Sequence, residues 1–160
     1  MRRKMRARAR ARARALPVLW MRRLTPVRRR RLCSKHTTVA LTINEDESRL
    51  REDFAAWLLK LAPPARPYLH NDLDERPASA ADRAAIERNW VDKGMGTLEE
   101  FMAQEPVNAH AHLLASLLGC TESVPVVGGE LCLGQWQSIM MVELDGPRQR
   151  SVVCQVTGLR

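Results

Sequence analysis

The chain has 160 residues and a mass of 18.2 kDa, and 45% of its residues are hydrophobic, enough for one domain with a core. No apolar run approaches the ~18 residues of a membrane-spanning helix, so we predict no membrane span. The net charge of +8 is uneven, because residues 1–32 hold 14 of the 26 Lys and Arg residues and no acid. All 18 Asp and Glu residues lie in residues 33–160, whose acidic balance argues against nucleic-acid binding by this part.

The four cysteines, Cys33, Cys120, Cys132 and Cys154, form no CxxC pair. This spacing excludes a zinc ribbon. Disulfide scaffolds are short, secreted and denser in cysteine, so that class does not fit either. We predict four free, buried thiols in a reducing compartment.

Residues 1–32 form a basic tail, which opens on an Arg–Ala alternation and ends on a second cluster, Arg28–Arg31. Like charges repel and few apolar groups are available to bury, so we predict disorder. Three origins are open: low-complexity translation from a misplaced start codon, a transit peptide, or an arm that binds nucleic acid or anionic membrane through counterion release. A transit peptide would place the protein in a plastid or mitochondrion instead of the cytoplasm, but the tail has no serine.

Residues 33–160 begin with a strand and a helix. Thr37–Ile43 alternates, with Val39, Leu41 and Ile43 on one face, which is typical of a half-buried strand. Apolar residues at helical spacing then predict an amphipathic helix over Leu50–Leu61, stopped by two prolines.

A charged, weakly apolar segment at about 73–107 follows. Ser79 with Asp82 and Thr97 with Glu100 each place a capping residue three positions before an acid, which predicts two helix starts. We therefore predict a helical insertion on the surface.

The last part of the chain is mostly strand. A helix is predicted from the cap Asn108 through Leu118, and a hairpin around Gly128–Gly129. Long alternating segments predict strands at Gln135–Leu144 and Ser151–Val156. This order of elements predicts an α+β fold with mostly antiparallel strands and packed helices.

Four histidines are the first candidates for chemistry. His36 lies on the polar face of the first strand, and His70 follows a proline-bearing loop. His110 and His112 are two apart on a helix, so they point in different directions and only one of them can join a shared site. Three converging histidines with one open position are the ligand set of catalytic zinc, although each histidine is equally consistent with an ordinary polar role.

The long strand offers two further candidates. Gln137 and Glu143 share a face, where an amide and a carboxylate could orient imidazoles or act as acid and base; a solvated sheet face is the alternative. The chain has no GxSxG, GxxxxGK[ST], GxGxxG or HExxH motif, so common nucleophile, phosphate-loop, dinucleotide and zincin sites lack support.

Five blocks of the chain resemble motifs of one family. In chain order they are His36–Glu45, Tyr68–Asp72, Ala111–Gly119, Val124–Ile139 and Glu143–Arg148. They resemble HTSAxLTINE, YRHxD/E, AHxKSSLLG, IPVxxGxLxLGTWQGI and E-x-DGPR of the YjbQ-like proteins, also called secondary thiamine-phosphate synthases. The blocks keep the family order from His36 to about Gln155, so we identify the chain as resembling that family.

The resemblance implies a trimer of small α+β β-sandwich subunits with a cleft near the subunit contacts. The residues it assigns to that cleft are His36, His70 and His112, with Asn44, Glu45, Gln137 and Glu143 around them. From the ligand types we expect the three histidines to bind a divalent metal such as zinc. The implied activity is weak thiamine-phosphate synthesis from a pyrimidine pyrophosphate and a thiazole phosphate. The alternatives are a non-catalytic trimer that binds a small anion or serves as a scaffold, and nucleic-acid binding through the basic tail.

Two departures from the family matter. The insertion at about 73–107 stands where the family has a short acidic loop, and the basic tail stands where the family has a strand, a helix and a strand. We therefore expect the fold to lack part of the N-terminal sheet.

Overall fold

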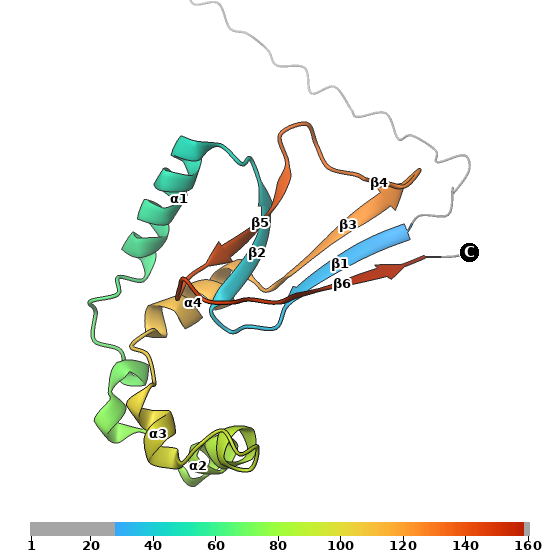
Figure 1. The fold of residues 1–160 in the computed structure, drawn as a ribbon. Helices are drawn as coiled ribbons and strands as arrows, with labels where there is room; N and C mark the ends of the chain where they lie inside the picture. The colour runs from blue at the N-terminus through green and yellow to red at the C-terminus, as the bar shows by residue number, and fades with distance from the viewer. Residues whose placement is uncertain (1–27, 159–160) are drawn as a thin grey trace, which may run out of the picture.

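The computed structural model describes residues 28–158 and has two antiparallel sheets with helices beside them (Figure 1). The strands are β1 (Arg28–Ser34), β2 (Val39–Asn44), β3 (Thr121–Val127), β4 (Glu130–Leu131), β5 (Ser138–Glu143) and β6 (Val152–Thr157). The helices are α1 (Ser48–Leu61), α2 (Ala80–Ile86), α3 (Leu98–Ala103) and α4 (Ala109–Leu118), with short 3-10 helices η1 (Leu69–Asn71) and η2 (Leu73–Glu75) and a π-helix η3 (Glu87–Val91). The predicted α+β fold is confirmed.

The larger sheet has the order β4-β3-β1-β6, so β1 is an inner strand paired antiparallel on both edges. This corrects the prediction that the basic tail is disordered through residue 32. Arg28–Arg31 stay exposed while their backbones pair with β3 and β6, so the strand forms without burying the charges. The rest of the predicted tail, residues 1–27, lies outside the described residues.

The smaller sheet pairs β2 with β5 and carries the most buried residues of the fold. The first predicted strand is confirmed, but Val39, Ala40 and Leu41 are at most 2% exposed, so here both of its faces are covered instead of one. In the register Val39 lies opposite Glu143 and Asn44 lies opposite Ser138, so these two pairs mark opposite ends of the ladder.

Helices α1 and α4 cover this sheet and confirm two predicted helices. Leu58 of α1 and Ala62, the residue that follows α1, meet Leu114 of α4. Partly buried residues of α1, α4, β5 and the chain just after β5 close the cluster. The N-terminus of α1 is capped by Glu47, whose carboxylate accepts the N–H groups of Arg49 and Leu50.

The helical insertion forms a separate lobe at the bottom of Figure 1. Both predicted caps are present: Ser79 accepts from the N–H of Asp82, and Thr97 forms a complete capping box with Glu100. None of the residues of α2, η3 or α3 is buried, as expected for a surface segment. The lobe is held internally by an edge-to-face contact between Trp90 and Phe101, whose ring centroids are 5.4 Å apart.

The C-terminal strands differ in length from the prediction. The hairpin turns at Gly128 and Gly129, with positive φ of 62° and 91°, a backbone conformation that glycine adopts without strain. Strand β5 begins at Ser138 instead of Gln135, because the Gly134 N–H donates to Gln137 Oε1 at 2.7 Å and folds residues 134–137 into a turn.

The four cysteines are free, as predicted, but their predicted burial is wrong: Cys120, Cys132 and Cys154 are exposed and Cys33 is half-buried. No helix among residues 28–158 is long and apolar enough to cross a membrane.

Candidate active site

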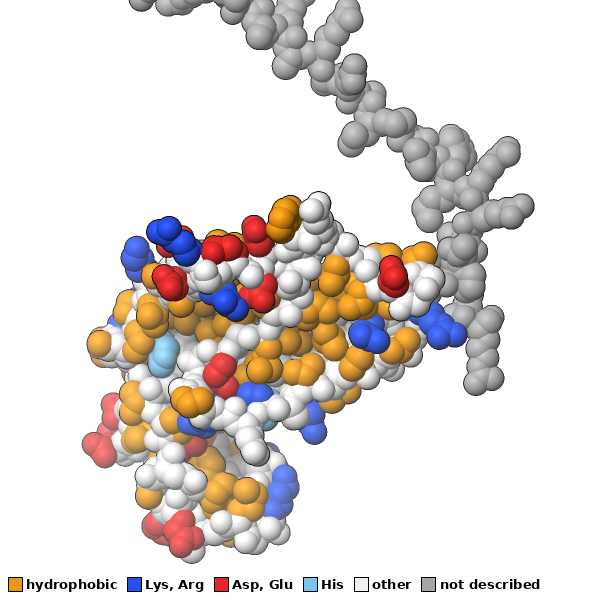
Figure 2. Space-filling view, turned by 45° about the horizontal axis from the view of Figure 1, so that its top comes forward, with side chains coloured by type: hydrophobic (Ala, Val, Ile, Leu, Met, Phe, Trp, Pro, Cys, Tyr) orange, Lys and Arg blue, Asp and Glu red, His pale blue; other side chains and the backbone are white. Residues whose placement is uncertain are grey.

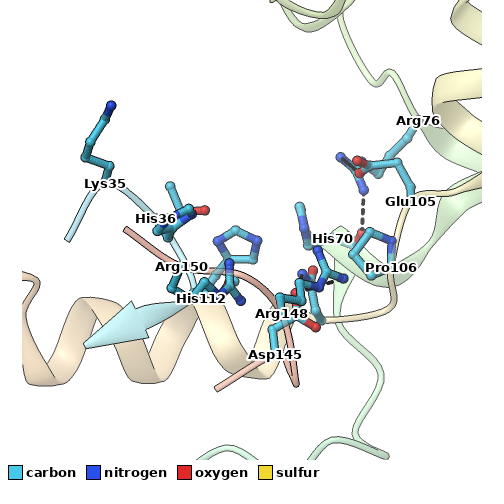
Figure 3. A pocket seen from close by; sticks show the side chains of 13 residues that line it. Lys35, His36, His70, Arg76, Glu105, Pro106, His112, Asp145, Arg148 and Arg150 are labelled. Atoms are coloured by element: carbon cyan, nitrogen blue, oxygen red, sulfur yellow. Dashed lines mark hydrogen bonds and ion pairs between the residues drawn. The ribbon is translucent and has the colours of Figure 1, made fainter. Parts of the chain in front are cut away.

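A cavity of about 390 Å³ lies where four segments meet: the β1–β2 connection, η1, the start of α4 and the loop before β6 (Figure 3). Its charged and histidine side chains are Lys35, His36, His70, Arg76, Glu105, His112, Asp145, Arg148 and Arg150. All three histidines of the predicted site therefore line one cavity. His110 is not among its lining residues, in line with the helix-face argument.

His70 and His112 form the closest part of this cavity. Their ring centroids lie 4.9 Å apart at an interplanar angle of 74°. Burial and then the positive charge of His70 lower the pKa of the His112 imidazole below its ordinary value of 6.5, against opposing effects of Asp145 and Glu105. The lowered pKa favours the neutral imidazole of His112, which can accept a proton.

The contact between the two rings depends on a capping bond that sequence reasoning missed. Asn71 Oδ1 accepts the N–H of Ala109 at 2.9 Å, so η1 caps the first turn of α4. Asn108 was the predicted cap, but its side chain makes no capping bond and instead donates to Asp145 Oδ2 at 2.6 Å. Both bonds join residues far apart in the sequence. The only signal in the sequence for the Asn71 cap was a polar side chain next to His70.

His36 is held on the other wall of the cavity. Its Nε2 accepts the Ser151 N–H at 2.8 Å, and Ser151 Oγ lies 3.2 Å from the same nitrogen. Within residues 28–158 no three His, Cys, Asp or Glu side chains lie close enough to hold a metal ion. The three histidines as they lie do not fit a zinc site. Zinc binding stays a prediction, tested by metal analysis of the purified protein.

Cationic side chains surround the histidines, and three of them are paired. Arg76 Nη2 lies 2.7 Å from Glu105 Oε2, and Arg148 Nη2 lies 3.2 Å from Asp145 Oδ2. Arg148 remains about half exposed. An anion that enters the cavity therefore meets guanidinium groups already held in place by carboxylates.

Glu143 acts through the third pair. It accepts two hydrogen bonds from Arg150, and Arg150 Nη2 also donates to Thr38 Oγ1 at 3.1 Å. These bonds from Arg150 lower the pKa of the Glu143 carboxyl, so it stays ionised and positions Arg150. A Cβ on Gly146 would collide with the Glu143 side chain, which explains a glycine in this turn.

Three other predicted site residues lie elsewhere in this chain. Asn44 is at the opposite end of the β2–β5 ladder from Glu143, roughly 17 Å away at ~3.3 Å per residue. Asn44 and Glu45 line a different pocket of about 10 Å³ beside α1. Gln137 is exposed, and its side-chain oxygen accepts a hydrogen bond from the Gly134 N–H. The strand parity that grouped Gln137 with Glu143 fails because Gln137 precedes the strand.

Comparison with known protein families gives a match over most of the chain: residues 31–159 match the family described as UPF0047 protein YjbQ-like. The chain belongs to the YjbQ-like family.

Similar YjbQ-like proteins come from several archaea. A UPF0047 protein of Archaeoglobus fulgidus is 38% identical over 118 residues, covering 74% of this chain and 68% of the relative. One from Methanothermobacter thermautotrophicus is 36% identical over 125 residues, covering 78% of this chain and 65% of the relative, so the chain spans about two thirds of that length. A hypothetical protein of Aeropyrum pernix K1, whose crystal structure is known, matches with a TM-score of 0.58 at 34% identity, over 84% of this chain and 75% of its own.

Proposed function

We propose that this YjbQ-like protein is an enzyme that binds a small phosphorylated substrate in the histidine-lined cavity, with activity of the thiamine-phosphate synthase type. The observation that carries the proposal is the contact between His70 and His112 inside a ring of cationic side chains. A neutral imidazole beside fixed guanidinium groups supplies a proton acceptor next to an anion site.

These contacts assign each residue a role in the proposed reaction. A thiazole nitrogen would donate its electron pair to the carbon that carries pyrophosphate, and that carbon–oxygen bond would break with its electrons on the departing pyrophosphate. Lys35, Arg148 and Arg150 would stabilise the developing negative charge. Glu143 would hold Arg150 in place, and His112 would exchange a proton with the substrates.

We propose likewise that the chain assembles as a homotrimer. The outer strand β6 is exposed along its whole length, including Val152, Val153 and Val156. Figure 2 shows hydrophobic side chains gathered over the strands. A neighbouring subunit on this sheet would cover such apolar surface, which is otherwise an aggregation liability.

The test is turnover of a pyrimidine pyrophosphate with a thiazole phosphate, followed by release of pyrophosphate and formation of thiamine phosphate. We expect His112→Ala and Arg148→Ala each to lower the rate about 100-fold, as for other acid–base and charge-stabilising groups. Arg83→Ala is the matched control for Arg148, because Arg83 also makes a short-range surface ion pair, with Glu87 in the insertion. Equal rates in Arg148→Ala and Arg83→Ala would contradict the proposal.

A non-catalytic anion-binding protein is the second candidate, and one observation favours it. Each carboxylate at or behind the cavity is already paired: Glu105 with Arg76, Asp145 with Arg148, and Glu143 with Arg150. Pyrophosphate binding that Arg148→Ala abolishes, in a protein with no turnover, would support this candidate.

A further inference from the structure

The insertion builds a second cavity of about 450 Å³ beside the candidate active site. It lies between η1, the segment after Arg76, α2 and α3, and we call it the insertion cavity. Its apolar lining consists of Leu69, Pro77, Ala78, Ala85, Ile86 and Phe101. A volume of this size suits part of a small ligand, and the side chains suit an apolar or aromatic group.

Two details indicate that an apolar group belongs there. Phe101 packs edge-to-face against Trp90, and this contact orients its ring. Leu69, another lining residue, is 93% exposed and lies in the short helix that Asn71 joins to α4. A leucine with so little cover buries apolar surface when a ligand packs against it.

The insertion cavity and the candidate active site share two lining residues, His70 and Arg76. Arg76 donates through Nη1 to the carbonyl of His70 at 3.3 Å and pairs through Nη2 with Glu105. Arg76 and Glu105 are the points where the chain enters and leaves the insertion, so this pair closes its stem beside the histidines (Figure 3).

We propose that the insertion cavity is the specificity compartment of the candidate site. It takes the apolar or aromatic end of a phosphate or pyrophosphate ester whose anionic group lies among Arg148, Arg150 and Lys35. This inference rests on the proposed anion site and adds the class of ester that the site selects. Asp82, which also lines the cavity, accepts a hydrogen bond from an amino or hydroxyl group on that ring.

A third cavity of about 500 Å³ competes for the same role. It lies on the other side of the β1–β2 connection and shares His36 and His112 with the candidate site. Its apolar side chains are fewer than those of the insertion cavity, and none is aromatic. It therefore serves as the control in the experiment.

The experiment titrates the full chain with methyl phosphate and with benzyl phosphate and compares their dissociation constants. We expect benzyl phosphate to bind at least tenfold more tightly, because its ring loses apolar surface to the insertion cavity. Ala78→Trp fills that cavity and should remove the preference while leaving methyl phosphate affinity within about twofold. Ser116→Trp fills the third cavity and should keep the preference. Leu69→Ser, at a nearly fully exposed position, lowers the preference without a packing risk.

The other outcomes contradict either the role of the insertion cavity or the anion site. Equal affinity of the two esters, or an unchanged preference in both Ala78→Trp and Leu69→Ser, overturns the compartment and leaves the anion site standing. Loss of the preference in Ser116→Trp alone assigns the ring to the third cavity and also overturns it. If neither ester binds, the anion site itself fails, and the compartment fails with it.

Discussion

The two walls of the candidate active site are built in different ways. His112 stands on α4, where Ala111, Leu114 and Ala115 are at most 7% exposed. His70 stands beside the insertion, whose helices bury no residue and whose position depends on the Asn71 cap and the Arg76–Glu105 pair. Packed cores are costly to disturb, whereas polar contacts at a surface can be lost singly. The site therefore joins a rigid wall, made by the sheets and α4, to an adaptable wall made by the insertion.

The largest effect is expected on the rigid wall. Leu114→Ala should lower the free energy of unfolding by about 2–5 kcal/mol, because it leaves a cavity between α1 and α4. Denaturant titration measures this loss. Leu113→Ala is the matched control on the same helix, since Leu113 is 52% exposed and should cost under about 0.5 kcal/mol. Similar losses in both variants would show that α4 is not packed as described.

Removal of the Glu143 charge should have the next largest effect. Glu143→Gln leaves Arg150, which is 8% exposed, without its ionised partner, and we expect a loss of about 1.5–3 kcal/mol near pH 7. The pKa of Glu143 is lowered in the folded protein, so its contribution is full above the ordinary value of 4.5 and disappears as the pH falls through the folded value. Unfolding curves of the wild type and the variant should therefore converge in acid, whereas exposed Glu130→Gln should follow the wild type throughout. A constant difference down to the acid limit would argue against the pair.

On the adaptable wall, Asn71→Ala should cost about 1 kcal/mol, the usual loss for a helix cap. Because the cap also holds η1, the variant should bind phosphate esters more weakly, which calorimetry measures. Asn89→Ala, at an exposed position of η3, controls for removal of an asparagine from the insertion. Unchanged stability and affinity in Asn71→Ala would show that η1 is held by other contacts.

The smallest effect is a change in titration. Because the pKa of His112 is lowered, its NMR midpoint, measured with a chelator present, should lie below 6.5. His70→Gln should move the midpoint upward by removing a nearby positive charge, and Asp145→Asn should move it downward. The unfolded state takes up this proton more readily, so His112 also makes stability fall as the pH drops through 6.5. Identical midpoints in the wild type and both variants would show that neither His70 nor Asp145 affects the pKa of His112.

What the sequence predicted depended on local signals. Ser79 and Thr97 cap helices because a capping residue and its acceptors lie within one turn, so their spacing alone was sufficient. The alternation of β2 predicted the burial of Val39 and Leu41, but it did not predict that Ala40 is buried as well and that Ile43 is only half-buried. The convergence of the three histidines followed the family motifs; no pattern within the chain could place three separate segments around one cavity.

The missed features are contacts between distant segments. The charge of Arg28–Arg31 indicated a tail, whereas pairing with β3 and β6 makes it a strand. Arg150, the partner of Glu143, lies beyond a turn whose path the sequence does not specify. Asn44 lies far from the site because β2 and β5 pair with Val39, and not Asn44, opposite Glu143. Local composition contains none of this information.

The place of β1 in the larger sheet also sets an order of events during synthesis. Arg29 pairs with Thr157, so the first described strand must wait for the last one before its second edge is closed. At ribosomal rates of ~5–20 residues per second, this delay is roughly 6–25 s. During that time an extended arginine-rich segment is held by β3 at most, and closure of such a long loop slows folding. A nascent chain of this protein therefore depends on its final six-residue strand, β6, to complete the sheet that its first described residues begin.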